Sequence, residues 1–308
     1  MLFVSITIPL LAQNSEDKTV YLDSLWKETT MGDHKYYRII KEYNTDKDSY
    51  QVTDYFKSGK VQMEGTFSDK DAKLKMGAFT YYYENGNKQS AVNYGKPGYI
   101  GKYAYWYENG NKQLEGEYLE TKTGISSELK IDQYWNPEAK QIVIDGNGYF
   151  EESDKNFYSK GNIKNGLRDG TWVGNNKTAS FSYTEKYENG KLISGLSIDS
   201  DNVEHHYTEL ETKPVPKRGI EHFYQYIGKN FNVTRESEKN NIYGKLISTF
   251  IVEKDGTIVD IKIIKSLGFG LDEELIRVLS ECPAWTPGEQ RGIKVRVLYS
   301  IPITIQKR

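Results

Sequence analysis

The stretch that decides the N-terminal fold reads WYENGNKQLEGEY, from Trp106 to Tyr118. Aromatic residues precede an Asn-Gly pair, and polar and apolar residues alternate after it. This arrangement predicts a β-hairpin whose turn suits type I′ geometry, in which both central residues need positive φ. A single hairpin cannot bury its own aromatic face, so we expect similar hairpins to stack beside it.

The same pattern recurs along the chain. Three further copies read YFKSGKVQMEGTF, YYENGNKQSAVNY and, more weakly, KYENGKLISG, and they begin at Tyr55, Tyr82 and Lys186. The first three turn glycines lie about 25 residues apart, a period typical of repeat architectures. We therefore predict type I′ turns at Asn85-Gly86, Asn109-Gly110 and Asn189-Gly190.

These copies resemble the bacterial variant of the MORN repeat, whose core is roughly Tyr-x-x-Asn-Gly-x-x-x-x-Glu-Gly-x-Tyr. The segment GLRDGTW, from Gly166 to Trp172, fits the element between such hairpins, whereas the copy from Tyr82 carries Ala91-Val92 in place of Glu-Gly. We assign residues 19–208 to this hairpin-repeat region. Its aromatic face has two interpretations. The rings pack hairpin on hairpin, as repeat architectures require, or they stack on a glycan or peptide ligand.

Composition and the N-terminus narrow the class of protein. The chain has 308 residues, a net charge of −2 and no long basic run, which makes nucleic acid a poor partner. The apolar run from Leu2 to Ala12 is too short to span a bilayer. It predicts a secretory signal over residues 1–13, the alternative being a buried strand. We therefore expect an exported protein, periplasmic or associated with the outer membrane, without a stable transmembrane anchor.

No motif predicts an enzyme, and we expect no catalytic residues, no cofactor and no metal site. The adjacent His205 and His206 would point to opposite faces of a strand, which suits chelation poorly. The single cysteine, Cys282, falls on the apolar stripe of a predicted helix and is interpreted as unreactive core. No nucleophile-elbow or zinc-protease motif occurs.

The pattern changes after a charged segment with two prolines, residues 209–218, which we interpret as a stiff linker. Residues 219–308 predict a small α+β domain in the order αββαβ, with a three-stranded antiparallel sheet. Its expected elements are a helix over 220–230, strands over 245–252 and 257–264 joined at Asp255-Gly256, a helix starting near Leu271, and a strand alternating from Lys294 to Ile303.

This C-terminal region resembles the TonB C-terminal domain. The resemblance rests on YGKLISTFIVEKDG from Tyr243, SLGFGLDEEL from Ser266, PAWTPG from Pro283 and VRVLYSIP from Val295. The Trp-x-Pro-Gly turn of the family is intact at Trp285, Pro287 and Gly288. One departure is Phe231-Asn232, which stands where family members carry Tyr-Pro after the first helix.

The resemblance implies a protein that supports energy-coupled transport across the envelope. The family grips a short segment of a TonB-dependent outer-membrane receptor by adding a strand to its sheet. Pro302 indicates that this part of the last strand lies at a sheet edge or near the end of the sheet, because proline cannot donate to a central ladder. Candidate partner-binding residues are Lys294, Arg296, Leu298 and Ser300. The two cations would receive an acidic partner segment, or they protect the edge from aggregation.

A second function remains open from the sequence. The chain lacks a long proline-rich rod, since it has only 8 prolines, and hairpin repeats take that place. The alternative is therefore a structural or ligand-binding periplasmic or surface repeat protein without energy transduction.

Overall fold

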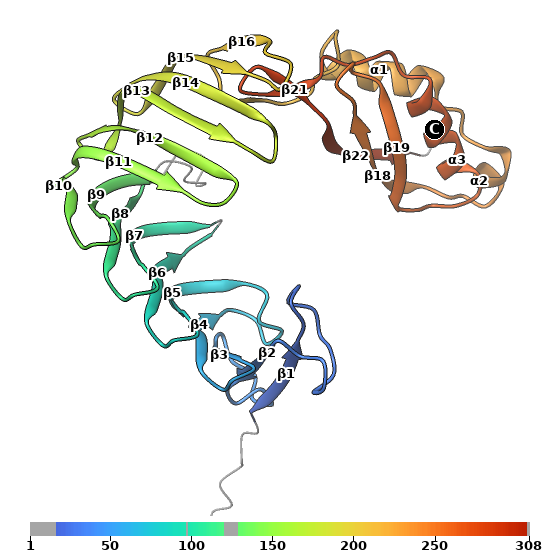
Figure 1. Ribbon diagram of the computed structural model, residues 1–308. Helices are drawn as coiled ribbons and strands as arrows, with labels where there is room; N and C mark the ends of the chain where they lie inside the picture. Colours follow the sequence, from blue (N-terminus) through green and yellow to red (C-terminus); the bar gives the residue numbers. More distant parts are fainter. Residues whose placement is uncertain (1–16, 97, 120–128, 307–308) are drawn as a thin grey trace, which may run out of the picture. The chain divides into compact units, whose positions relative to one another are not determined.

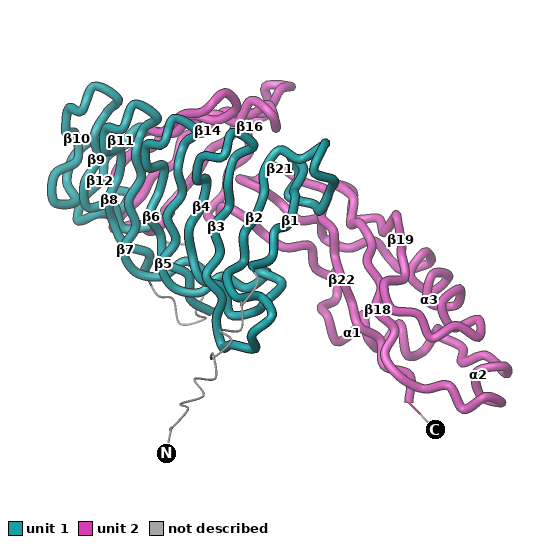
Figure 2. Tube along the Cα trace, turned by 90° about the horizontal axis from the view of Figure 1, so that it is seen from below, with its two compact units in different colours: residues 1–151, 161–169 teal, residues 152–160, 170–308 magenta. Residues whose placement is uncertain are grey.

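The computed structural model describes residues 17–96, 98–119 and 129–306. The chain divides into two compact units, residues 1–151 with 161–169 and residues 152–160 with 170–308 (Figure 2). The expected signal segment, residues 1–13, lies outside the described residues.

Strands dominate the N-terminal part, as Figure 1 shows. Sixteen antiparallel strands follow one another in chain order within one sheet, which confirms the predicted hairpin architecture. The strands are β1 (Lys18–Leu22), β2 (Tyr36–Ile40), β3 (Tyr50–Phe56), β4 (Val61–Phe67), β5 (Lys75–Tyr82), β6 (Lys88–Tyr94), β7 (Tyr99–Trp106), β8 (Lys112–Tyr118), β9 (Leu129–Trp135), β10 (Gln141–Ile144), β11 (Asn147–Ser153), β12 (Phe157–Lys164), β13 (Leu167–Asn176), β14 (Phe181–Glu188), β15 (Lys191–Ile198) and β16 (Glu204–Tyr207).

Two of the three predicted type I′ turns are wrong. At Asn109-Gly110 only the glycine has positive φ, 89°. The Gly110 N–H donates to the carbonyl of Tyr107, and the Tyr107 N–H donates to the carbonyl of Asn111, which closes a three-residue loop with a bulge. Asn85-Gly86 has the same geometry. Asn189-Gly190 is a type I′ turn as predicted, with φ of 48° and 82°.

The three-residue loop explains why the repeat motif carries an asparagine on each side of the turn glycine. The Asn109 carboxamide oxygen accepts from the main chain of Asn111 within the loop, at 2.9 Å. The side-chain amides of both asparagines then donate to the carbonyl of Pro137 in the following loop, at 3.1 and 3.0 Å. In the preceding repeat, Asn85 and Asn87 donate in the same way to the carbonyl of Glu108. The asparagines therefore join successive hairpins as well as shaping each turn.

The aromatic face of the first unit packs against itself. Phe79 and Tyr103 are buried with apolar side chains of β2 to β6 in one cluster. The rings of Phe79 and Tyr94 meet edge to face at 4.9 Å, and those of Tyr99 and Tyr118 stack at 5.0 Å. These contacts support the packing interpretation of the repeat aromatics, since each hairpin covers the rings of its neighbour.

The C-terminal region of the second unit contains the predicted αββαβ elements. The helices α1 (Ile220–Asn230) and α3 (Leu271–Ser280) and the strands β18 (Gly244–Val252) and β19 (Ile258–Lys265) confirm the sequence prediction to within a residue or two. The elements that sequence reasoning missed are the helix α2 (Arg235–Lys239) and the short strands β17 (Glu211–Thr212), β20 (Gly288–Gln290) and β21 (Ile293–Val295).

The last predicted strand is divided. Only β22 (Val297–Ile305) belongs to the three-stranded antiparallel sheet, whose order is β19-β18-β22. Lys294 and Val295 instead lie in β21, which forms a second small sheet with β17 and β20. The β20–β21 hairpin turns at Arg291-Gly292, whose φ values of 50° and 75° are those of a type I′ turn.

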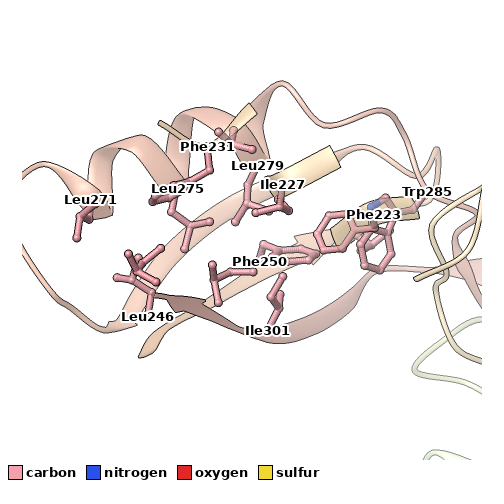
Figure 3. Packing of buried hydrophobic residues seen from close by; sticks show 14 residues of the cluster. Phe223, Ile227, Phe231, Leu246, Phe250, Leu271, Leu275, Leu279, Trp285 and Ile301 are labelled. Carbon is pink, nitrogen blue, oxygen red and sulfur yellow. The ribbon is translucent and has the colours of Figure 1, made fainter. Parts of the chain in front are cut away.

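The core of this region lies between the helices and one face of the β19-β18-β22 sheet. Figure 3 shows Leu271, Leu275 and Leu279 of α3 above Leu246 and Phe250 of β18. At one end, the buried ring of Trp285 meets those of Phe223, Phe250 and Tyr299 at 5.0 to 5.6 Å. The hairpin turn at Gly256 fits here because a side chain at that position would collide with the carbonyl of Trp285.

Candidate functional site

The candidate site is the outer edge of β22. This strand pairs on one side with β18, from Val297 opposite Val252 to Ile305 opposite Gly244. In the described part of the chain its other side has no neighbouring strand. Main-chain groups on that side are therefore available to an added strand.

The four candidate residues lie along one continuous segment, and all are exposed. Lys294 is in β21, Arg296 lies between the strands, and Leu298 and Ser300 are in β22. Leu298 is 70% exposed and so presents an apolar side chain to solvent at this edge. Its cross-strand neighbour Ile251 is half-buried on the sheet face opposite the core. The edge thus combines free main-chain groups with an apolar side chain.

Arg296 is not a free cation. Its Nε and Nη2 atoms each lie 2.8 Å from Oε1 of Glu253, and Nη2 lies 3.5 Å from Oδ2 of Asp260. Two carboxylates, one just after β18 and one on β19, therefore already offset the charge of Arg296, for which the sequence left an acidic partner and protection of the edge both open. Lys294 remains exposed on β21.

Pro302 indicates which main-chain groups face outward. It lies opposite Ile247 of β18 and has no N–H to donate. Along an antiparallel strand, alternate residues direct their main-chain groups to opposite sides. A proline is tolerated where those groups face the free edge. Leu298 and Ser300 alternate with the residues between them in step with Pro302, so their main-chain groups point to the same side as those of Pro302. We infer that the N–H groups of Leu298 and Ser300 point away from β18.

The loop that departs from the family pattern is held by α3. Phe231 packs into the core, and Oε1 of Glu274 accepts from the main chain of Asn232 at 2.8 Å. The Arg277 guanidinium, 2.7 Å from Glu274, together with these bonds lowers the pKa of the Glu274 carboxyl to about 2. The segment Phe231-Asn232, which follows the C-terminal end of α1, is therefore held in place by the carboxylate of Glu274 on α3.

A buried ion pair joins the β20–β21 hairpin to β14 within the second unit. Nε of Arg291 lies 2.7 Å from Oε1 of Glu185, whose side chain is fully buried. The hydroxyls of Tyr187 and Tyr207 also donate to this carboxylate, at 2.9 and 2.8 Å. The guanidinium lies 4.2 Å from the centre of the Tyr183 ring. Burial alone would lower the pKa of Arg291, but the charge and the hydrogen bond of Glu185, together with the nearby tyrosines, outweigh it and raise that pKa.

The expected linker also carries main-chain pairing. Glu211 and Thr212 pair with Gln290 and Glu289 of β20, and Val215 forms a bridge with Thr286. The Ser197 hydroxyl donates to the carbonyl of Arg291 at 2.7 Å. These bonds hold the segment before α1 against the β20–β21 hairpin and the residues that precede it.

Other candidates from the sequence take ordinary structural positions. Nε2 of His205 lies 2.8 Å from the Asp199 carboxylate. Cys282 is not part of a helix stripe, because α3 ends at Ser280, and it is half-buried just beyond that end. Among the described residues, no group of histidine, cysteine or acidic side chains is arranged to hold a metal ion. Within the same residues, no helix has the length and apolar composition needed to cross a bilayer.

Comparison with known proteins bears on the C-terminal region. No curated protein matches the chain. The match to a family model covers residues 234–304 and does not include the hairpin repeats, whose resemblance to MORN-variant repeats stays a prediction. That family is the C-terminal domain of Gram-negative bacterial TonB protein, a non-enzymatic energy-transducing domain, and the match suggests a TonB-like protein of the cell envelope.

Proposed function

We propose that this chain is an envelope protein that binds an exposed segment of a TonB-dependent outer-membrane receptor. The segment adds as a strand to β22, in support of energy-coupled transport. The observation that carries the proposal is that β22 is an edge strand of a domain matching the TonB C-terminal family. Strand addition uses main-chain bonds for affinity and side-chain contacts for selectivity.

The chemistry of the edge favours an extended, partly apolar partner. Leu298 offers an exposed apolar contact, while Ser300 leaves room for a neighbouring main chain. Because Arg296 is paired with Glu253 and Asp260, recognition depends less on an acidic partner than the sequence alone implied. Lys294 extends the same surface beyond the end of β22 and supplies the unpaired positive charge that would steer an acidic residue.

The test is a pull-down of envelope proteins with the full chain, followed by mass spectrometry of the captured proteins. Leu298→Pro removes one outward N–H from the edge and should abolish capture of an outer-membrane receptor. Tyr299→Pro is the contrasting variant, since it removes an N–H directed at β18 and should unfold the domain. Ser300→Ala keeps the main chain and should capture the receptor normally.

The outcome distinguishes the two functions left open by the sequence. Receptor capture that is lost in Leu298→Pro with an unchanged melting temperature, and kept in Ser300→Ala, supports strand addition at β22. If the wild-type chain captures no receptor while a repeat-region fragment binds an envelope component, the protein is a structural or ligand-binding repeat protein instead.

A further inference from the structure

A cavity of about 490 Å³ lies where the chain enters α1, on the side of the C-terminal region formed by Trp285. Its apolar wall consists of Phe223, Tyr226, Pro283, Ala284 and Trp285. This volume is within the range of small-molecule sites, which run from about 300 to 1,000 Å³. Cys282 also lines it, and burial raises the pKa of that thiol.

The rim of the cavity is cationic. Lys217, Arg218 and His222 line it, and none of its lining residues is acidic. Nη1 of Arg218 lies 3.2 Å from Nε2 of His222. Lys217 and Arg218 supply the positive charge of this rim.

The wall and rim are held together by main-chain bonds. Val215 and Thr286 exchange N–H···O bonds of 3.1 and 2.8 Å, which place Pro216 beside the Trp285 segment. The N–H of Gly219 then donates to the carbonyl of Pro216 and turns the chain into α1. No side chain caps α1 at Gly219, so the first N–H groups of the helix add a positive end to this rim.

Trp285 forms the fixed back of this wall. Its side chain is buried, and its hydrogen bond with the Cys282 thiol opposes the rise in the thiol pKa that burial causes. A ligand in the cavity therefore meets the Trp285 ring as an apolar surface.

We propose that this cavity binds a small amphiphilic anion, an apolar chain or ring bearing one carboxylate, with the carboxylate at Arg218 and the apolar body against Phe223 and Trp285. The proposal is independent of strand addition at β22. It assigns the C-terminal region a second binding site, on its helical side, for an apolar monocarboxylate.

Cys282 provides the reporter, because it is the single cysteine of the chain. The experiment measures its alkylation by N-ethylmaleimide with mass spectrometry, on the full chain, with octanoate or its uncharged analogue octan-1-ol as the probe. Octanoate should slow alkylation in a saturable manner. Octan-1-ol should need about tenfold higher concentration for the same protection, because it lacks the charge-assisted hydrogen bonds.

Two matched variants test the position of the charge. In Arg218→Gln, the concentrations of octanoate and octan-1-ol that give the same protection should lie within about twofold of each other, since the contact with Arg218 accounts for the difference. Lys229→Gln removes an equivalent charge from the far end of α1, outside the cavity, and should behave as wild type. Equal protection by octanoate and octan-1-ol in the wild-type chain, or no protection by either, overturns the proposal. An equal effect of both variants also contradicts it.

Discussion

The buried pair between Glu185 and Arg291 gives the sharpest stability prediction. Arg291→Met removes the 2.7 Å contact from a fully buried carboxylate that keeps other contacts, among them the hydroxyls of Tyr187 and Tyr207. Removing one partner of a buried ion pair costs about 3–5 kcal/mol. The two hydroxyls remain as donors, which places the expected loss near the lower limit, about 3 kcal/mol.

Arg296→Met is the matched control, since it also breaks an ion pair between an arginine and a carboxylate. Arg296 is 53% exposed, so its pairs with Glu253 and Asp260 should contribute only about 0–1 kcal/mol. The assay is urea unfolding of both variants followed by circular dichroism. The double variant Glu185→Gln with Arg291→Met should lose less than Arg291→Met alone, because the buried negative charge is then removed together with its arginine. Equal losses in Arg291→Met and Arg296→Met would refute the reasoning from burial.

Three further predictions concern the repeats, the α3 loop and export. Gly110→Val should destabilise its hairpin by about 1–3 kcal/mol, because φ is 89° there, whereas Gly32→Val, at a position without positive φ or a close contact, should melt as wild type. Glu274 has a lowered pKa, so its stabilisation is complete above its ordinary value of 4.5 and is lost as pH falls toward about 2. The difference in unfolding free energy between wild type and Glu274→Gln should shrink across that interval; a constant difference would contradict the lowered pKa. Mass spectrometry of the exported protein should find an N-terminus near Gln13, and a retained Met1 in an inner-membrane fraction would exclude cleavage.

Sequence patterns predicted the elements that bury a continuous face. Helix α1 ends where its apolar spacing ends, and β18 alternates over nine residues, so both boundaries were predictable. The turn type at Asn109-Gly110 was not, because Asn-Gly fits two-residue and three-residue loops alike. Asn111 favours the three-residue loop, since its side-chain amide donates to the carbonyl of Pro137 in the following loop.

The charged contacts of the candidate site were beyond sequence reasoning. Strands β20 and β21 have three residues each, too short for an alternation signal. Glu185 and Arg291 are 106 residues apart, and no local pattern connects them. The edge position of β22 was foreseen from Pro302, but the pairing of Arg296 with Glu253 depends on how the sheet brings β18 and β22 together.

The measurement that tests strand addition most directly is amide hydrogen exchange in the full chain. It is made with and without a peptide from the exposed segment of the receptor identified by capture. The amides of Leu298 and Ser300 should exchange rapidly in the free chain, while those of Tyr299 and Ile301 are already protected by β18. Binding of the peptide should slow Leu298 and Ser300 by at least about tenfold, which corresponds to about 1.4 kcal/mol of protection. Saturating binding that leaves both amides unchanged would contradict the proposed site.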